Sequence, residues 1–316
     1  RIVGSDNGDT DKFATQATAN DQPVSDGYVV NFADNTDHLD IPSTTQAGWQ
    51  VVGTSLGTFA YRVNANAVTE LNLLGNLGNA SFRQAGQSYG MILLPESATA
   101  ADIEAARKLL IDRGAADGVI STSYYTNWIG RNDIVEFKAI NFSSATSVSY
   151  AWHQMSQLVS FPNLDLTNTT DASNAWSASG SLSSFGTTEI SNCTNFTSAW
   201  KSCSALTSFP AGAKLGTAAN NVNFSFAWNS SGLTAFNTPL PTANSVYYAW
   251  QNCTSLTSFS SELPLVTDVR LAWHTCSSLS EFRTTDIKNG TNFSPAWQNC
   301  SSLQSFPADA KLGTEA

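Results

Sequence analysis

The feature that most constrains this 316-residue chain is an Ala-Trp pair that recurs seven times after residue 150. Successive tryptophans are 22 to 28 residues apart. They are Trp152, Trp176, Trp200, Trp228, Trp250, Trp273 and Trp297. A repeat of this period indicates a solenoid, because one such unit cannot bury its own apolar face and must stack on its neighbours.

Two further apolar positions stay in register with the tryptophan. Leucine follows six residues later at Leu158, Leu182, Leu206, Leu256, Leu279 and Leu303. Phenylalanine follows nine residues later at Phe161, Phe185, Phe209, Phe259, Phe282 and Phe306. In the repeat of Trp228 both come one residue early, as Leu233 and Phe236. We expect Trp, Leu and Phe to form ladders in which each side chain contacts its counterpart in the next repeat.

These residues also resemble a known family. Segments such as AWKSCSALTSFP (199–210) and AWQNCTSLTSFS (249–260) are similar to the Ala-Phe-x-x-Cys-x-x-Leu-x-x-Ile core of BspA-like, treponemal-type leucine-rich repeats. With Ala-Trp at the start, they resemble the repeats of marine phage fibres and bacterial surface proteins. The resemblance implies a short strand at Leu-x-x-Phe and a tight helical turn at Ala-Trp-x-x-Cys in each repeat of about 24 residues. It also implies that the repeats serve mostly as binding surfaces.

The chain therefore divides into three parts. Residues 1–95 form a β-rich domain, with strands expected at 26–33, 48–54, 57–65 and 89–95 between Gly, Asn and Asp turns. Residues 96–135 form a capping helix and linker, and residues 136–316 form the solenoid. The fold class we expect is a β-dominated leucine-rich repeat solenoid, preceded by a smaller β-rich α+β domain, with Trp49 in its core.

One clear helix is expected, with Thr99 as its N-cap and Gly114 at its end. Its apolar stripe is Ile103, Ala106, Leu110 and Arg113, widened by Leu109 and Ile111. Its place ahead of the solenoid suggests that it closes the first repeat and shields Trp128, Ile134, Phe137 and Ile140.

Charge excludes several partner classes. The net charge is −10, the sequence pI is about 4.6, and only 13% of residues are charged. Few cations are therefore available to neutralise phosphates, so we expect no nucleic-acid partner. Neither a basic run nor an apolar stretch of membrane-spanning length occurs, so we expect no membrane insertion. The low charge favours an extracellular surface, either a virion appendage or a bacterial cell surface.

Four of the five cysteines stand three residues after a tryptophan: Cys203, Cys253, Cys276 and Cys300. Met155 and Ser179 take the same position in earlier repeats, whereas Cys193 lies elsewhere. A position that accepts serine argues against obligate disulfides, so we expect buried thiols that act as small apolar groups. The spacing also lacks the paired Cys-x-x-Cys of a zinc site.

No motif points to catalysis or to a cofactor. His38, His153 and His274 stand in no catalytic pattern, and the acids of the repeats are single and scattered, which disfavours a glycoside hydrolase. The acidic runs 5–11 and 33–40 could hold calcium, although neither follows an established loop pattern and solvated turns are commoner. We expect a non-enzymatic protein without a metal site.

Two functions remain. The first is a phage tail fibre or adhesin that binds a cell-surface receptor, glycan or protein, through exposed residues of the strand: Thr207, Ser208, Thr257, Ser258, Ser280 and Glu281. The second is a structural subunit of a fibre, sheath or filament, as a homo-oligomer or beside other subunits. This alternative follows from residues 306–316, which parallel 209–219 and end inside a repeat, so that we expect a longer parent chain or a covered terminus.

Overall fold

The computed structural model of the chain divides into two compact units, which are described separately. One unit holds residues 1–122 and 126–144, and the other holds residues 123–125 and 145–316. The residues that the structure describes are 24–25, 30–32, 39–41, 48–54, 57–63, 71–73, 86–95, 97–112, 114–117, 128–138 and 142–313.

The first unit is built on an antiparallel sheet in the order β1-β2-β7-β4-β5-β8. Its strands are β1 (Val24–Ser25), β2 (Val30–Phe32), β4 (Gly48–Thr54), β5 (Gly57–Val63), β7 (Gly86–Pro95) and β8 (Ile134–Lys138). A second pair joins β3 (Leu39–Ile41) to β6 (Leu71–Leu73). Expected strands thus occur at all four sites, and β4 has the expected bounds. The Gly, Asn and Asp turns between these short apolar segments made the strands readable.

Helix α1 (Ala100–Asp112) packs on the sheet of its own unit. Thr99 caps it as expected: its hydroxyl accepts from the N–H of Asp102 at 3.2 Å, and the Asp102 carboxylate accepts from the N–H of Thr99 at 2.8 Å. The buried stripe is Ile103, Ala106 and Leu110, which share a core with Trp49. The expected stripe is too wide, because Leu109 is 46% exposed.

Trp128 lies in the core of this first unit, where its ring meets Phe59 and Phe137 edge-on at 5.4 and 5.5 Å. Ile134 is buried there as well, and Ile140 lies outside the described residues. That α1 closes the first repeat stays a prediction.

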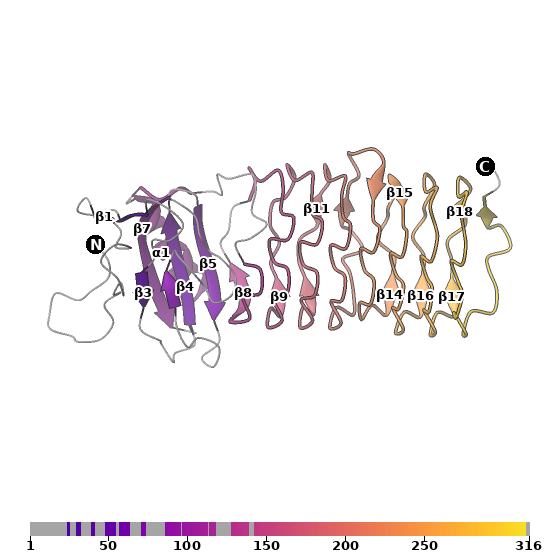
Figure 1. Ribbon diagram of the computed structural model, residues 1–316, viewed down its shortest axis with the longest axis horizontal. Coiled ribbons are helices and arrows are strands. Elements are labelled where there is room, and N and C mark those ends of the chain that lie inside the picture. Colours follow the sequence, from indigo (N-terminus) through magenta and orange to yellow (C-terminus); the bar gives the residue numbers. More distant parts are fainter. Residues whose placement is uncertain are drawn as a thin grey trace. The chain divides into compact units, whose positions relative to one another are not determined.

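The second unit is a β-solenoid of about seven turns, which we call rungs, with narrow coils that follow one another in chain order (Figure 1). The Leu-x-x-Phe segments form short strands that pair parallel and in register, so that Phe161 lies beside Phe185 and Phe236 beside Phe259. These strands are β9 (Ser160–Phe161), β10 (Ser184–Phe185), β14 (Ala235–Phe236), β16 (Ser258–Phe259) and β17 (Glu281–Phe282). The strand expected in each repeat is thus present in these five rungs.

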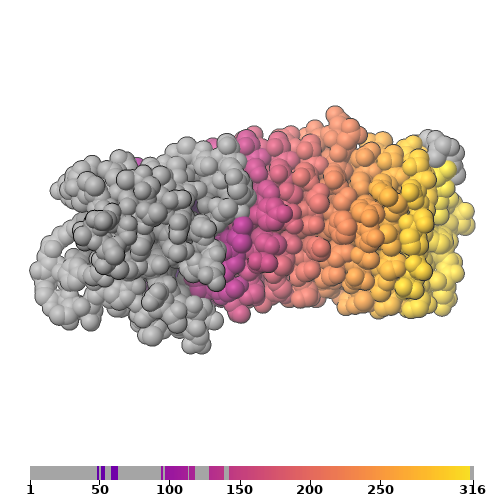
Figure 2. Space-filling view, viewed as in Figure 1, coloured from indigo at the N-terminus to yellow at the C-terminus, as the bar shows by residue number. Residues whose placement is uncertain are grey.

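Other short strands also pair parallel between rungs, β11 with β12, β13 with β15 and β18 with β19. Their bounds are β11 (Glu189–Ile190), β12 (Lys214–Leu215), β13 (Val222–Asn223), β15 (Ala243–Ser245), β18 (Asp286–Ile287) and β19 (Lys311–Leu312). In Figure 2 successive colours cross the solenoid surface as narrow bands, because each rung reaches the surface beside its neighbours.

The expected helical turn at Ala-Trp-x-x-Cys is wrong: the chain there runs through consecutive β-turns. In the rung of Trp176, the N–H groups of Ala175, Ser177 and Ser179 donate to carbonyls three residues earlier. The intervening N–H groups, Trp176 among them, donate instead to the next rung, at 2.9 Å from Trp176 to the carbonyl of Ala199. Alternate donors thus serve the turn and the stack, an arrangement that a helix could not provide.

Left-handed residues make these turns possible. The residue two before the tryptophan has a positive φ in six rungs, and the residue two after it has one in all seven. Examples are Asn174 at 54° and Ala178 at 61°. Because only Gly and to a lesser degree Asn and Asp adopt this region at low cost, the sequence gives little warning of it.

The tryptophans form one continuous stack, the tryptophan column. Neighbouring indoles lie 5.2 to 5.6 Å apart between centroids and within 9° of parallel. The phenylalanines form a second column, each ring edge-on to tryptophan, which ends at Phe306: this ring is turned by 72° from Phe282 and is 39% exposed. The ladder leucines are buried up to Leu279, and Leu303 is half-buried. Stacking and burial hold the tryptophan column, since the buried Nε1 of Trp200 makes no hydrogen bond.

Candidate functional site

The strand positions expected to bind a receptor lie at the surface. Thr207, Ser208, Thr257, Ser280 and Glu281 are exposed, and Ser258 is half-buried. Two of their hydroxyls serve the solenoid: Thr257 donates to the carbonyl of Thr234 at 2.9 Å, and Ser280 donates to that of Thr257 at 3.3 Å. These two hydroxyls keep only acceptor capacity, and a binding role for this strand face stays a prediction.

A different face stands out by its charge. We call it the turn face, and it comprises the exposed parts of residues 148–157, 172–181, 196–205, 224–233, 246–255, 269–278 and 293–302. The chain has 25 acidic residues, yet none falls in these segments, which carry Lys201, Arg270, His153 and His274. Within an acidic protein, the turn face is therefore neutral to positive.

Three aromatic side chains gather on the turn face where the rungs of Trp228 and Trp250 meet. Phe226 and Tyr248 stack at 4.7 Å and 5°, and Tyr247 meets both edge-on at 5.4 and 4.3 Å. All three are half-buried, so each keeps part of its ring in solvent. A hydrogen bond with Tyr247 raises the pKa of the Tyr248 hydroxyl. Aromatic groups that gather at the surface and keep part of their rings in solvent are typical of binding surfaces.

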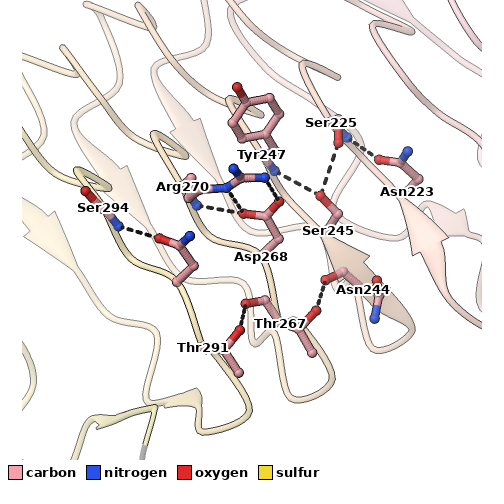
Figure 3. Close-up of polar contacts among 11 residues, drawn as sticks. Asn223, Ser225, Asn244, Ser245, Tyr247, Thr267, Asp268, Arg270, Thr291 and Ser294 are labelled. Carbon is pink, nitrogen blue, oxygen red and sulfur yellow. Dashed lines mark hydrogen bonds and ion pairs between the residues drawn. The ribbon is translucent and has the colours of Figure 1, made fainter. Parts of the chain in front are cut away.

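Two cations flank this aromatic cluster. The Lys201 ammonium lies 5.4 Å from the ring centre of Phe226, and the Arg270 guanidinium lies 4.6 Å from that of Tyr247. Arg270 also donates to both carboxylate oxygens of Asp268, at 2.9 and 2.7 Å (Figure 3). That hydrogen-bonded pairing lowers the pKa of Asp268. Among the described residues, no carboxylate pairs with Lys201.

A row of polar side chains runs beside the aromatic cluster. The Asn229 amide donates to Gln251 at 2.8 Å, and the Gln251 amide lies 3.3 Å from Nδ1 of His274. These residues follow the tryptophan directly in three successive rungs. The row therefore advances along the solenoid in step with the aromatic cluster.

The aromatic residues occupy strained positions. Phe226 has φ 59° and Tyr248 has φ 57°, whereas the same position holds Asn174 and Ser198 in earlier rungs. A bulky residue in this region is a backbone outlier, and Tyr150 and Leu271 adopt the same φ at the same position, so the solenoid turn imposes it. Because the rings are only half-buried, the core alone does not account for them.

A ladder of polar caps holds the start of each turn face segment. Five residues before each tryptophan stands Ser, Asp or Asn, and its side-chain oxygen accepts from the N–H two residues on (Figure 3). Asn223, Ser245 and Asp268 do this beside the aromatic cluster, and Ser225 and Ser245 are joined at 3.1 Å. These caps fix the backbone that carries the rings.

Sequence reasoning missed both this ladder and the aromatic cluster. The ladder has a sequence signal, because a polar residue stands five positions before each of the seven tryptophans. The apolar pattern of Trp, Leu and Phe does not include that position. The signal of the cluster is weaker: aromatic residues stand two before the tryptophan at Tyr150, Phe226 and Tyr248 only.

Among the described residues, no group of three His, Cys, Asp or Glu side chains is placed to hold a metal ion. The acidic runs 5–11 and 33–40 lie outside the described side chains. All five cysteines are buried free thiols, as expected. Among the described residues there is no helix with the length and apolarity to cross a membrane.

Comparison of the chain with protein-family models, curated proteins and solved structures finds no match.

Proposed function

We propose that this chain is a non-enzymatic receptor-binding protein of an extracellular surface, and that its solenoid binds a cell-surface glycan or protein. The observation that carries the proposal is the half-buried aromatic cluster Phe226, Tyr247 and Tyr248, flanked by the cations Lys201 and Arg270 on turn face segments without acids. Tyr and Arg are the residues that most often dominate binding surfaces.

The finer identity belongs to the same proposal. The spacing of Trp, Cys, Leu and Phe supports repeats of the BspA-like, leucine-rich type, in a phage tail fibre or appendage or a bacterial adhesin. Such a protein would act at the virion or cell surface. The first unit would then be a smaller β-rich domain ahead of the repeats.

Retention of the labelled chain on a panel of bacterial cells, cyanobacteria included, tests this function. Phe226→Asn places in its rung the residue that Asn174 provides in another, so the fold is preserved while one ring is lost. Together with Tyr247→Ala, it is expected to lower retention at least tenfold. The matched control is Thr257→Arg on the strand face, which is expected to leave retention unchanged.

Retention on no member of the panel would overturn the proposal, and ordered filaments in the same preparation would favour the structural subunit. Retention that Thr257→Arg abolishes and Phe226→Asn spares would move the site to the strand face. Equal thermal stability of the variants shows that neither result comes from misfolding.

A further inference from the structure

We propose that the turn face binds an extended acidic polysaccharide that lies along the solenoid axis, with sugar rings packed against the Phe226–Tyr248 pair and a carboxylate paired with Lys201. This inference rests on the proposed function and names the ligand class of the same site.

The charge distribution favours an anionic ligand. The chain carries a net charge of −10, but the turn face segments contain no Asp or Glu. The nearest carboxylate to the cluster is that of Asp268, which Arg270 already pairs. A bound carboxylate would thus meet the ammonium of Lys201 without a competing acid on this face, and charges beyond about 10 Å are largely screened by salt.

The shape of the cluster favours a sugar ring. The rings of Phe226 and Tyr248 stack on each other across two rungs and, being half-buried, leave part of their apolar edges in solvent. The Gln251 amide, held by the buried Asn229, runs half-buried beside them and keeps acceptor capacity. A pyranose has the same division, since its ring faces carry C–H groups and its edges carry hydroxyls.

The period of the solenoid fits a polymer. Stacked indoles of successive rungs lie 5.2 to 5.6 Å apart between centroids, and paired strands lie about 4.8 Å apart. One sugar ring adds about this length to an extended glycan, so neighbouring rings can meet equivalent positions on neighbouring rungs. A polymer that follows this period would gain from several weak contacts at once.

Nucleic acid fits the same face less well. Its two charged anchors, Lys201 and Arg270, could neutralise few phosphates, whereas phosphate contacts supply most nucleic-acid affinity. A sparse polyanion with apolar ring faces matches three aromatic rings and one unpaired ammonium better.

Titration of the whole chain with alginate, a polymer of carboxylate-bearing sugars, tests the inference. The matched probe is the same alginate after reduction of its carboxylates to alcohols. We expect alginate to bind about tenfold more tightly than its reduced form, with the difference shrinking as salt rises. Lys201→Gln should remove that preference, and Tyr248→Asn should weaken binding of both polymers. Polysialic acid and its reduced form repeat the comparison with a different acidic sugar.

Equal affinity of the acidic and reduced forms for both polymers, or an unchanged preference in Lys201→Gln, would overturn the inference. So would the absence of binding to all four probes. If cells still retain the chain in that case, the receptor-binding function stands and its ligand is of another class. Retention that protease treatment of the cells abolishes would identify a protein receptor.

Discussion

The thiol of Cys203 donates to the backbone carbonyl of Trp176, one rung earlier, with a distance of 3.2 Å between sulfur and oxygen. Cys276 and Cys300 repeat this contact with Trp250 and Trp273, both at 3.0 Å. Ser179 uses its hydroxyl in the same way, at 3.0 Å from the carbonyl of Trp152. From the second rung on, this position therefore holds a small donor, which explains why cysteine and serine both occupy it, whereas Met155 takes it in the first rung.

Two substitutions of Cys203 distinguish the contribution of its hydrogen bond to stability from that of its apolar packing. Cys203→Ser keeps the donor and should lower the free energy of unfolding by less than about 1 kcal/mol, whereas Cys203→Ala loses it and should cost about 1–2 kcal/mol. Urea unfolding measures both. Since serine is the more polar residue, a larger loss for serine than for alanine would show that packing alone matters at this position.

Alkaline pH should destabilise the solenoid through its thiols. Burial raises the pKa of Cys203 and Cys193 from 9.0 to about 12 and that of Cys253 to about 11. Below pH 9 both states keep the protons, so the stability is fully present. Between pH 9 and the folded values only the unfolded chain releases them, and stability falls by up to about 1.4 kcal/mol per thiol and pH unit. Unfolding curves from pH 8 to 11 measure this slope, and a triple Cys→Ser variant should flatten it.

In the rung of Trp228, Leu233 follows the tryptophan by five residues instead of six, and Gly232 stands directly before it. A Cβ on Gly232 would lie 2.1 Å from the carbonyl oxygen of Ser204, a clash with backbone of the preceding rung. Gly232→Ala should cost about 1–3 kcal/mol. Gly180 has the same place in its rung, but its Cβ would meet only the Ser204 hydroxyl at 3.6 Å. Thermal unfolding should therefore show Gly180→Ala near wild type, and equal losses would argue against this packing.

The stability lost when a tryptophan of the column is replaced by alanine should depend on the rung. Trp200 is fully buried between two stacked indoles, and Trp200→Ala should lower the free energy of unfolding by about 3–5 kcal/mol. Trp297 is half-buried, and of the other column members it stacks only on Trp273, so Trp297→Ala should cost clearly less. Equilibrium unfolding of both variants checks the order, and a reversal would contradict the rung-by-rung coupling expected of a solenoid.

Much of the solenoid could be predicted from the sequence, because buried ladders impose a register on Trp, Leu and Phe. The absence of disulfides could be predicted from Ser179 in a cysteine position. The turns could not, since a left-handed φ at Ala178 or Phe226 has no residue signature. The aromatic cluster was missed for a related reason: Tyr247 and Tyr248 become neighbours of Phe226 only after the rungs stack.

Oxidative footprinting of the chain on the cells that retain it tests the central claim most directly, because it reports which face is covered. Hydroxyl radicals label exposed side chains, among them Tyr247 and Tyr248 on the turn face and, outside it, Val159 and Leu265, which are 48% and 52% exposed. The account predicts that labelling of the tyrosines falls on binding while Val159 and Leu265 stay unchanged. Protection of Val159 or Leu265 with the tyrosines fully labelled would contradict it.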